Sequence, residues 1–142
     1  MRALLDVNVL IALLDENHAQ HQTVSEWFEA HIKHGWASCP LTQNGCVRIL
    51  SQPRYPNVLG AAEAVMRLRI AVSTPWHSFL ADDVSLLNDH AVDRHQLLAP
   101  RQLTDVYLLA LAVSHGARFV TLERSVPLGA VRRATADSLT VI

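Results

Sequence analysis

The sequence predicts an α/β fold in which a parallel β-sheet is covered by helices on both faces. A short apolar run ending at Leu5 and a second at 118–122 are typical of buried strands. Helical patterns separate these strands, and this alternation favours a parallel sheet with helices on both sides. Because no repeat, low-complexity tract or linker interrupts the pattern, we expect residues 1–142 to form a single domain.

Composition narrows the class of protein. Half of the 142 residues are apolar and 18% are charged, as in a compact globular domain. No apolar run approaches the ~18–20 residues needed to span a bilayer. The N-terminus lacks signal-peptide features, and Cys39 and Cys46 do not form a CxxC pair, so we expect a cytoplasmic protein with reduced thiols and no membrane partner.

The net charge of −1 gives the chain no overall field that would attract nucleic acid. Eleven of the twelve cationic residues are Arg, the residue that binds phosphate through a bidentate fork. Genome composition also raises Arg usage, so the excess of Arg over Lys can reflect either phosphate binding or genome composition.

The first half of the chain is expected to contain two strands and three helices. The opening strand leads into a buried helix that ends near Leu14, before a polar break. An amphipathic helix follows over residues 20–33, where Val24, Trp27, Phe28 and Ile32 share one face. A short strand over 36–39 precedes a helix over 40–50, which begins with Pro40 at its first turn.

The second half is expected to begin with a helix over 61–68 and, at most, a short strand over 78–80. Residues 86–96 have no readable pattern. A buried helix over 103–115 begins with Thr104 as a candidate N-cap and ends at Gly116. Strands are expected over 118–122 and 138–142.

Four oxygen-bearing side chains are predicted at one edge of this sheet. In a parallel sheet with right-handed crossovers, every strand end and every helix start lies at the same edge. Asp6 and Glu123 end strands, and Gln43 and Asp105 lie in first helical turns; Asn8 and Thr104 could join them. Three converging carboxylates repel one another unless a cation lies between them, and oxygen ligands suit Mg²⁺ or Mn²⁺. This arrangement would support metal-assisted phosphodiester hydrolysis with one metal ion or two.

Each candidate residue also has an ordinary explanation. Asp6 could cap a helix, Asp105 could be a helix-start acid, and Glu123 could be a loop acid. Other candidates also have two explanations. The pairs His18/His21 and His31/His34 could bind a metal or be exposed histidines, and Asp82-Asp83 could be a metal pair or a turn. Arg48 and Arg124 could contact RNA or form ion pairs.

Four segments in order resemble the PIN-domain ribonucleases, and closely the VapC toxins of bacterial toxin–antitoxin pairs. These segments are residues 5–10 (LDVNVL), 40–49 (PLTQNGCVRI), 103–110 (LTDVYLLA) and 119–124 (FVTLER). The resemblance implies a three-layer α/β/α sandwich with a parallel sheet of about five strands. It also implies Mg²⁺- or Mn²⁺-dependent RNA cleavage and a homodimer neutralised by a VapB-type antitoxin, through which the complex would bind operator DNA.

Carried over from the family, Asp6 is the first metal-binding acid and Asp105 the third. This chain departs from the family at two positions, because Gln43 stands where Glu is common and Glu123 where Asp is common. We therefore expect Asp6, Asp105 and Glu123 to hold a weakened metal site, with Gln43 orienting water or substrate. The alternative is a PIN-fold RNA-binding or regulatory partner with weakened catalysis. In the family, the early helices receive the antitoxin, and here these helices include Trp27 and Phe28.

Overall fold

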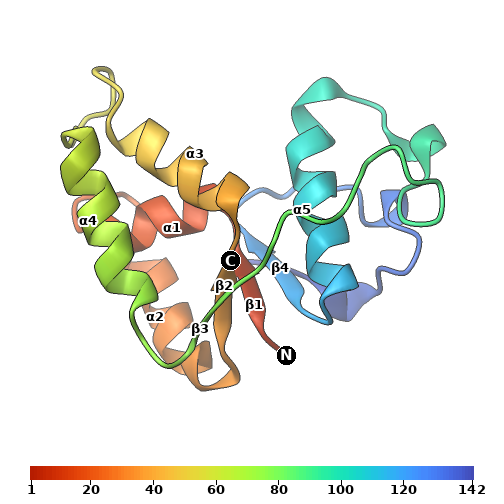
Figure 1. Ribbon diagram of the computed structural model, residues 1–142, viewed down its shortest axis with the longest axis horizontal. Coiled ribbons are helices and arrows are strands. Elements are labelled where there is room, and N and C mark those ends of the chain that lie inside the picture. Colours follow the sequence, from red (N-terminus) through yellow and green to blue (C-terminus); the bar gives the residue numbers. More distant parts are fainter.

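The computed structural model describes all 142 residues and contains one five-stranded sheet (Figure 1). Every neighbouring pair of strands is parallel, in the order β3-β2-β1-β4-β5. The chain thus confirms the predicted parallel sheet. The strands are β1 (Ala3–Leu5), β2 (Trp36–Ser38), β3 (His77–Phe79), β4 (Arg118–Thr121) and β5 (Leu139–Val141).

Helices cover both faces of the sheet, which completes the predicted α/β/α sandwich. In Figure 1, α1 (Val7–Leu14), α2 (His21–His31), α3 (Pro40–Leu50) and α4 (Ala61–Val72) lie on one side, and α5 (Leu103–Ser114) lies on the other. Five short 3₁₀ helices, η1 (Ile32–His34), η2 (Arg94–Gln96), η3 (Pro100–Gln102), η4 (Leu128–Ala130) and η5 (Ala136–Ser138), lie between the longer elements. None of the helices is both long enough and apolar enough to cross a membrane.

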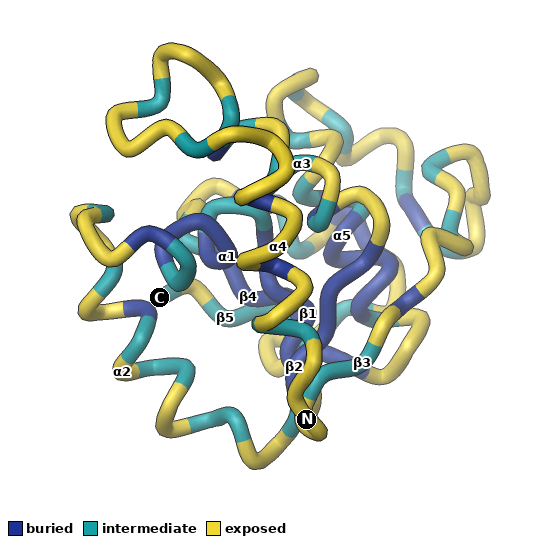
Figure 2. Tube along the Cα trace, turned by 60° about the vertical axis from the view of Figure 1, so that its left-hand side comes forward, coloured by how far each residue is buried: buried dark blue, intermediate teal, exposed yellow.

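Alternating strand residues build two hydrophobic cores, one on each face of the sheet. In β1, Ala3 and Leu5 pack among the residues of α1–α4, whereas Leu4 packs with α5. In β4, Phe119 joins the α5 core and Val120 the opposite one. Figure 2 shows these buried strands at the centre of the molecule, beneath more exposed helices. Side chains of a strand point to alternate faces, so three or four residues suffice to supply both cores.

Several boundaries differ from the predicted ones. Helix α4 continues four residues past Leu68, to Val72. Thr104 does not cap α5, because the 3₁₀ turn η3 runs directly into the helix and its first residue is Leu103. The unreadable segment 86–96 forms turns and η2, and is tied to the fold by an isolated bridge between Val92 and Val131.

Asp15, a buried carboxylate, fixes the loop after α3 to the end of α1. Its oxygens accept hydrogen bonds from the Tyr55 hydroxyl and the Asn57 amide, and its own backbone N–H caps α1 by donating to the Ile11 carbonyl. Because an unpaired buried charge is costly, these donors explain how Asp15 is tolerated at 7% exposure.

Gly45 sets the distance between α3 and α1. A Cβ atom at Gly45 would lie 2.8 Å from Cγ2 of Val7, the residue that follows Asp6. A contact this short forces one helix or the other to move, since Val is stiff about its first side-chain torsion. The small residue therefore holds the first turn of α1 close to α3.

We expect Gly45→Ala to lower the free energy of unfolding by about 1–3 kcal/mol, the usual cost of overpacking, as measured by urea denaturation. Val7→Ala in the same chain should restore much of this loss by removing the clashing methyl group. Gly129→Ala is the matched control, because a Cβ atom there meets nothing within 4 Å. Additive effects of the two substitutions would contradict the proposed contact.

Candidate active site

The candidate site lies at the carboxyl ends of β1 and β4, the two central neighbours in the sheet. Asp6 directly follows β1, and its backbone N–H donates to the Val120 carbonyl at 2.9 Å. This extends the pairing of the two strands by one residue and places Asp6 beside Thr121, the last residue of β4. Open parallel sheets bind their ligands at this edge.

The Asp6 carboxylate is 6% exposed and both of its oxygens accept hydrogen bonds. Oδ1 accepts the Val7 backbone N–H at 2.7 Å, and Oδ2 accepts the Thr121 hydroxyl at 2.6 Å. Burial raises the pKa of Asp6, these two hydrogen bonds oppose the rise, and the charge of Glu123 adds to it. The carboxylate is therefore held in one orientation, in surroundings that disfavour its negative charge.

Thr121 is the residue that connects this site, and it is not among the residues predicted from the sequence. Its buried hydroxyl donates to Asp6 and accepts from the Asn8 side-chain amide at 3.3 Å and the Glu123 backbone N–H at 3.0 Å. A hydroxyl has one hydrogen to donate and two lone pairs, so its capacity is filled. Asn8 also accepts the Leu122 N–H, which confirms its expected place at this edge. The feature of the sequence that could have indicated Thr121 is a hydroxyl residue at the last position of a buried strand.

Asp105 brings a second carboxylate to the edge from the first turn of α5. Burial, followed by the charges of Asp6 and Glu123, raises the pKa of Asp105 to about 6. No hydrogen bond to its side chain compensates for the burial. The charges of the three predicted acids thus act on one another at this edge.

Glu123 is exposed and turned toward its own loop. Its Oε1 accepts the Ser125 backbone N–H at 3.0 Å and the Ser125 hydroxyl at 2.7 Å. These bonds lower the pKa of Glu123, with a further contribution from the positive charge of Arg101. Glu123 therefore influences the other acids by its charge while its side chain is held by Ser125.

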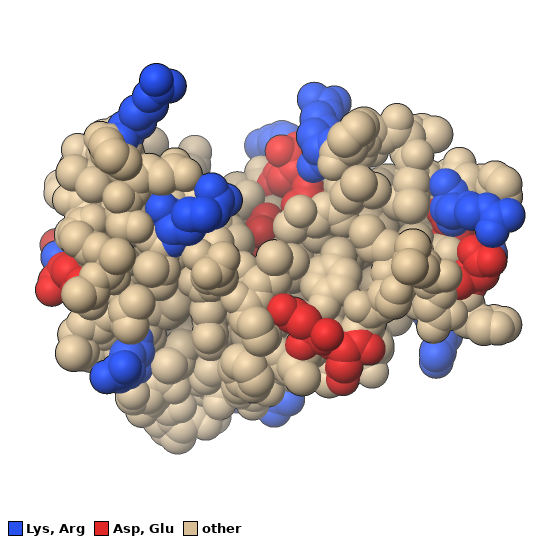
Figure 3. All heavy atoms as spheres, turned by 45° about the horizontal axis from the view of Figure 1, so that its top comes forward, with Lys and Arg blue, Asp and Glu red and all other residues tan.

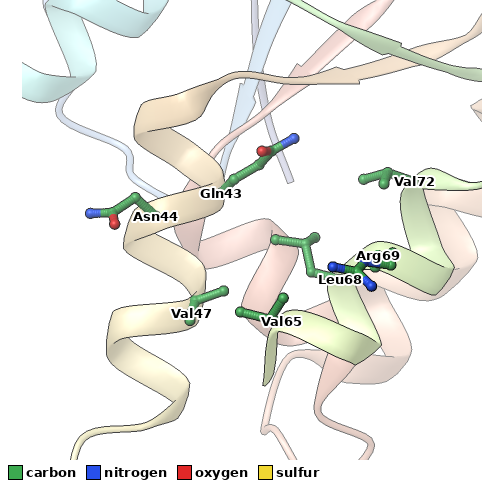
Figure 4. Close-up of a pocket in the computed structure, with 7 residues that line it drawn as sticks. All are labelled: Gln43, Asn44, Val47, Val65, Leu68, Arg69 and Val72. Carbon is green, nitrogen blue, oxygen red and sulfur yellow. The ribbon is translucent and has the colours of Figure 1, made fainter. Parts of the chain in front are cut away.

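Gln43 lies at the predicted edge, in the first turn of α3, but its side-chain amide is held by Ser38 rather than by the acids. Its side-chain nitrogen donates to the Ser38 hydroxyl at 2.9 Å. Figure 4 shows Gln43 and Asn44 pointing to opposite sides of α3, with Gln43 on the side of α4. Successive helix residues differ by about 100° in direction, so a shift of one position moves a side chain to another face.

Asn44 is the α3 side chain that faces α5. One turn earlier, the Leu41 backbone N–H donates to Asp82, and the charge and hydrogen bond of Asp82 contribute to the raised pKa of Tyr107 in α5. Asn44 is exposed and points away from α4. Its neutral amide is the α3 side chain on the opposite side from Gln43.

The donor set fits Mg²⁺ or Mn²⁺ only as an open site. No three His, Cys, Asp or Glu side chains are arranged as a ready-made metal cluster. Mg²⁺ does not require one, because it keeps several waters and binds through one or two carboxylates together with substrate phosphate. Burial, with a smaller contribution from neighbouring acids, raises the pKa values of Asp6 and Asp105, and a divalent cation bound there would favour their charged forms.

The surroundings of this edge combine acids with unpaired cations. Figure 3 shows carboxylates in a hollow of this face, with cationic side chains along its rim. Arg48 and Arg124 are exposed and form no ion pair within the chain. The ion pair expected as one explanation of Arg48 is therefore absent from α3, which leaves its guanidinium available to a ligand or a partner.

The histidines singled out in the sequence have structural partners. The His18 ring accepts the Gln20 N–H, and the rings of His21 and His31 bond to the carbonyls of Ala12 and Trp27. The Asp82 carboxylate accepts the Leu41 N–H and Asp83 pairs with His115 at 2.9 Å, although residues 82–83 do not form the predicted turn. His34 is exposed, as expected, whereas His18, His21 and His31 are half-buried, and none of these histidines or acids belongs to a metal-binding group.

Comparisons with known proteins identify the family of the chain. The PIN domain family matches residues 3–127. "Ribonuclease VapC44" of Mycobacterium tuberculosis is 50% identical over 142 residues, covering all of both chains. "Ribonuclease VapC38" of the same species is 44% identical over 125 residues, covering 87% of this chain and 86% of the relative.

Solved structures show the same fold at low sequence identity. VapBC2 from Rickettsia felis, bound to a promoter DNA fragment, aligns with a TM-score of 0.62 at 13% identity, covering 87% of this chain and 89% of that one. VapC20 of Mycobacterium tuberculosis, described as a sarcin-ricin loop cleaving toxin, aligns with a TM-score of 0.57 at 14% identity, covering 82% and 85%.

In the absence of divalent cations, we expect Asp105→Asn to raise the melting temperature at pH 7. The raised folded-state pKa means that ionisation destabilises the fold, a loss that develops as pH rises from the ordinary value of 3.8 to about 6. After discounting for solvent screening, a gain of about 1 kcal/mol corresponds to about 2–4 °C.

Thermal melts in EDTA between pH 4 and pH 7 would measure this effect. The gain should be largest at pH 7 and shrink as the pH falls toward the ordinary pKa of an Asp. Asp137→Asn, at an exposed acid in η5, is the control. A gain that is independent of pH would contradict the electrostatic explanation.

Proposed function

This chain belongs to the PIN-domain family, and specifically to its VapC ribonucleases, and we propose that it is the endoribonuclease toxin of a toxin–antitoxin pair. In this proposal, residues 1–142 act as one PIN domain in the cytoplasm and hydrolyse RNA phosphodiester bonds with Mg²⁺ or Mn²⁺. The observation that carries it is the pair of carboxylates, Asp6 and Asp105, whose pKa values are both raised at the ligand-binding edge of the sheet.

Asp6 and Asp105 are the residues that would hold the metal ion directly. Thr121 orients Asp6, and Asn8 holds Thr121 in place. Glu123 would contribute through a water, since Ser125 holds its carboxylate. When bound, a divalent cation supplies polarisation of the phosphoryl oxygen and a water of lowered pKa.

Asn44 gives this site a neutral oxygen in place of a further charge. Its amide could hydrogen-bond to a water or a phosphate oxygen but would attract a cation less strongly than a carboxylate. We therefore propose a weak metal site, completed by substrate phosphate. The exposed cations Arg48, Arg101 and Arg124 would contact the RNA backbone around it.

A second candidate function is a PIN-fold RNA-binding or regulatory partner with weakened catalysis. The observation favouring it is that no three acids are arranged as a ready-made metal cluster. Such a protein would bind RNA and antitoxin without metal-dependent cleavage. The two candidates therefore differ in a single measurable activity.

We further propose that a VapB-type antitoxin covers an apolar cavity between α1, α2 and α4, and that operator DNA is bound only through it. The cavity has a volume of about 250 Å³ and is lined by Leu13, Phe28, Ala71 and other mainly apolar residues. Phe28 thus faces this cavity, whereas Trp27 stacks on His31 with ring centroids 4.3 Å apart. A homodimer, as the family resemblance implies, belongs to the same proposal.

Asp6→Ala should abolish Mg²⁺-dependent cleavage of structured RNA, with a loss of at least about 10³-fold, because it removes the best-positioned carboxylate. Cleavage would be followed on gels across a Mg²⁺ and Mn²⁺ series, with EDTA as the metal-free reference. Asp137→Ala, at an exposed acid in η5, is the matched control. Metal-dependent cleavage that survives Asp6→Ala would overturn the nuclease assignment, and no cleavage by the wild type would favour the second candidate.

Ala71→Arg should weaken antitoxin binding by at least about tenfold, because it places a long charged side chain in the apolar cavity. Ala62→Arg, at an exposed position of the same helix, should have little effect. Co-purification with the antitoxin from a neighbouring gene, followed by titration calorimetry, would measure the difference. Equal affinities for the two variants would place the antitoxin elsewhere.

A further inference from the structure

A second cavity lies between α3 and α4. This α3/α4 pocket has a volume of about 390 Å³ and is lined by aliphatic side chains of both helices, with polar groups from Gln43, Asn44 and Arg69 (Figure 4). Small-molecule sites of proteins have this size and this combination of apolar walls with a few polar groups. None of the three acids Asp6, Asp105 and Glu123 lines the pocket.

Gln43 is held in one orientation by a chain of hydrogen bonds. Its Nε2 donates to the Ser38 hydroxyl at 2.9 Å, and the Ser38 oxygen lies 2.8 Å from Nε2 of His77. Burial lowers the pKa of His77, which favours the neutral ring, and the tautomer that carries its proton on Nδ1 accepts the Ser38 proton at Nε2. Ser38, which is fully buried, then accepts from Gln43 and fixes which end of the amide carries the donors.

The fixed amide presents one donor beside one acceptor. Nε2 has a second hydrogen, and Oε1 has no hydrogen-bond partner in the structure. An amide in this state forms a bidentate pair with N6 and N7 of adenine, where a donor also lies beside an acceptor. Guanine presents two acceptors at the same edge and would leave Oε1 facing another oxygen.

Arg69 gives the pocket an unpaired positive charge. On the same helix, Arg67 pairs with Glu63 at 3.2 Å, whereas the Arg69 guanidinium has no carboxylate partner and is exposed. No acid lines the pocket. A ligand that combines a flat apolar ring with a negative charge, as a nucleotide does, matches these walls and this cation.

The pocket adjoins the acidic edge. Ser38 ends β2, and the pairing of Leu4 with Ala37 brings Leu5 and Asp6 alongside Ser38. Neighbouring strands lie about 4.8 Å apart, so Gln43 is anchored one strand away from the acids. Asn44 also lines the pocket, although its side chain points away from α4.

We propose that the α3/α4 pocket binds one unpaired adenine of the RNA substrate, with Gln43 pairing with its N6/N7 edge and Arg69 contacting an adjoining phosphate. The proposal rests on the function proposed above and adds a base preference to it. Proteins read single-stranded RNA through splayed-out bases that they contact by their faces and edges. Ser38 and His77 are positioning residues, since they act through Gln43.

Binding of labelled oligouridylate hexamers that carry one central adenine, guanine, cytosine or 7-deazaadenine tests this directly. Fluorescence anisotropy with the full chain in EDTA at about 0.15 M salt prevents cleavage, and the repulsion from the acids cancels in ratios between probes. We expect the adenine probe to bind about tenfold more tightly than plain oligouridylate. The 7-deazaadenine probe lacks N7 and should lose most of this advantage.

Three variants separate a base contact from a general effect on the fold. Gln43→Ala and Gln43→Glu should bring the ratio of adenine to uridine affinity close to one. Ser38→Ala should reduce it only in part, because the amide remains but loses its fixed orientation. Gln96→Ala, at an exposed glutamine in η2, is the control, and circular dichroism checks that each variant folds.

Equal binding of all probes, a preference for another base, or an adenine preference that survives Gln43→Ala would overturn the proposal. So would a Gln43→Ala variant that binds RNA normally and antitoxin weakly, because the pocket would then belong to a protein interface. Metal-dependent cleavage is measured separately. If cleavage is absent but the adenine probe still binds more tightly, the proposed nuclease function is wrong and the adenine site stands. If cleavage is normal but all probes bind equally, only the proposed adenine site is wrong.

Discussion

The hydrogen bond between the Thr121 hydroxyl and the Asp6 carboxylate is the contact on which the site depends. A carboxylate at 6% exposure needs polar partners to remain ionised, and Thr121 supplies one from the neighbouring strand. The same hydroxyl accepts from Asn8 and from the Glu123 backbone, so one side chain orients residues of α1 and of the loop after β4. The edge of the sheet is therefore a fixed frame around a charge that the chain itself does not neutralise.

Negative and positive charges are separated at this edge of the sheet, with Asp6 and Asp105 buried or half-buried and the arginines exposed. Burial and neighbouring acids disfavour the charged forms of Asp6 and Asp105. The exposed side chains of Arg48 and Arg124 form no ion pair within the chain. A net charge of −1 conceals this separation. Local arrangement, rather than overall charge, is what would let an almost neutral protein hold both a metal ion and a polyanion.

Elements and edge positions followed from the sequence because they depend on periodicity and parallel topology. Strand ends and helix starts share an edge, which placed Asp6 and Asp105 correctly. The rotation of a helix about its own axis cannot be predicted from periodicity and topology. Which way Gln43 and Asn44 point depends on how α3 packs on α1, where Gly45 lies against Val7. Thr121 was missed for a related reason, since its role exists only once β4 lies beside β1. The predicted start of α5 at Leu103 was right, but the predicted cap Thr104 was wrong, because η3 continues into the helix without a side-chain cap.

The two halves of the Asp6–Thr121 contact are 115 positions apart in the chain. During synthesis, α1 to α4 can collapse together early, but β4 cannot pair with β1 until nearly the whole polypeptide has left the ribosome. A nascent or truncated chain therefore lacks an ordered Asp6, however well its first half has folded. If the chain is the nuclease proposed above, its site is assembled only when synthesis is almost complete.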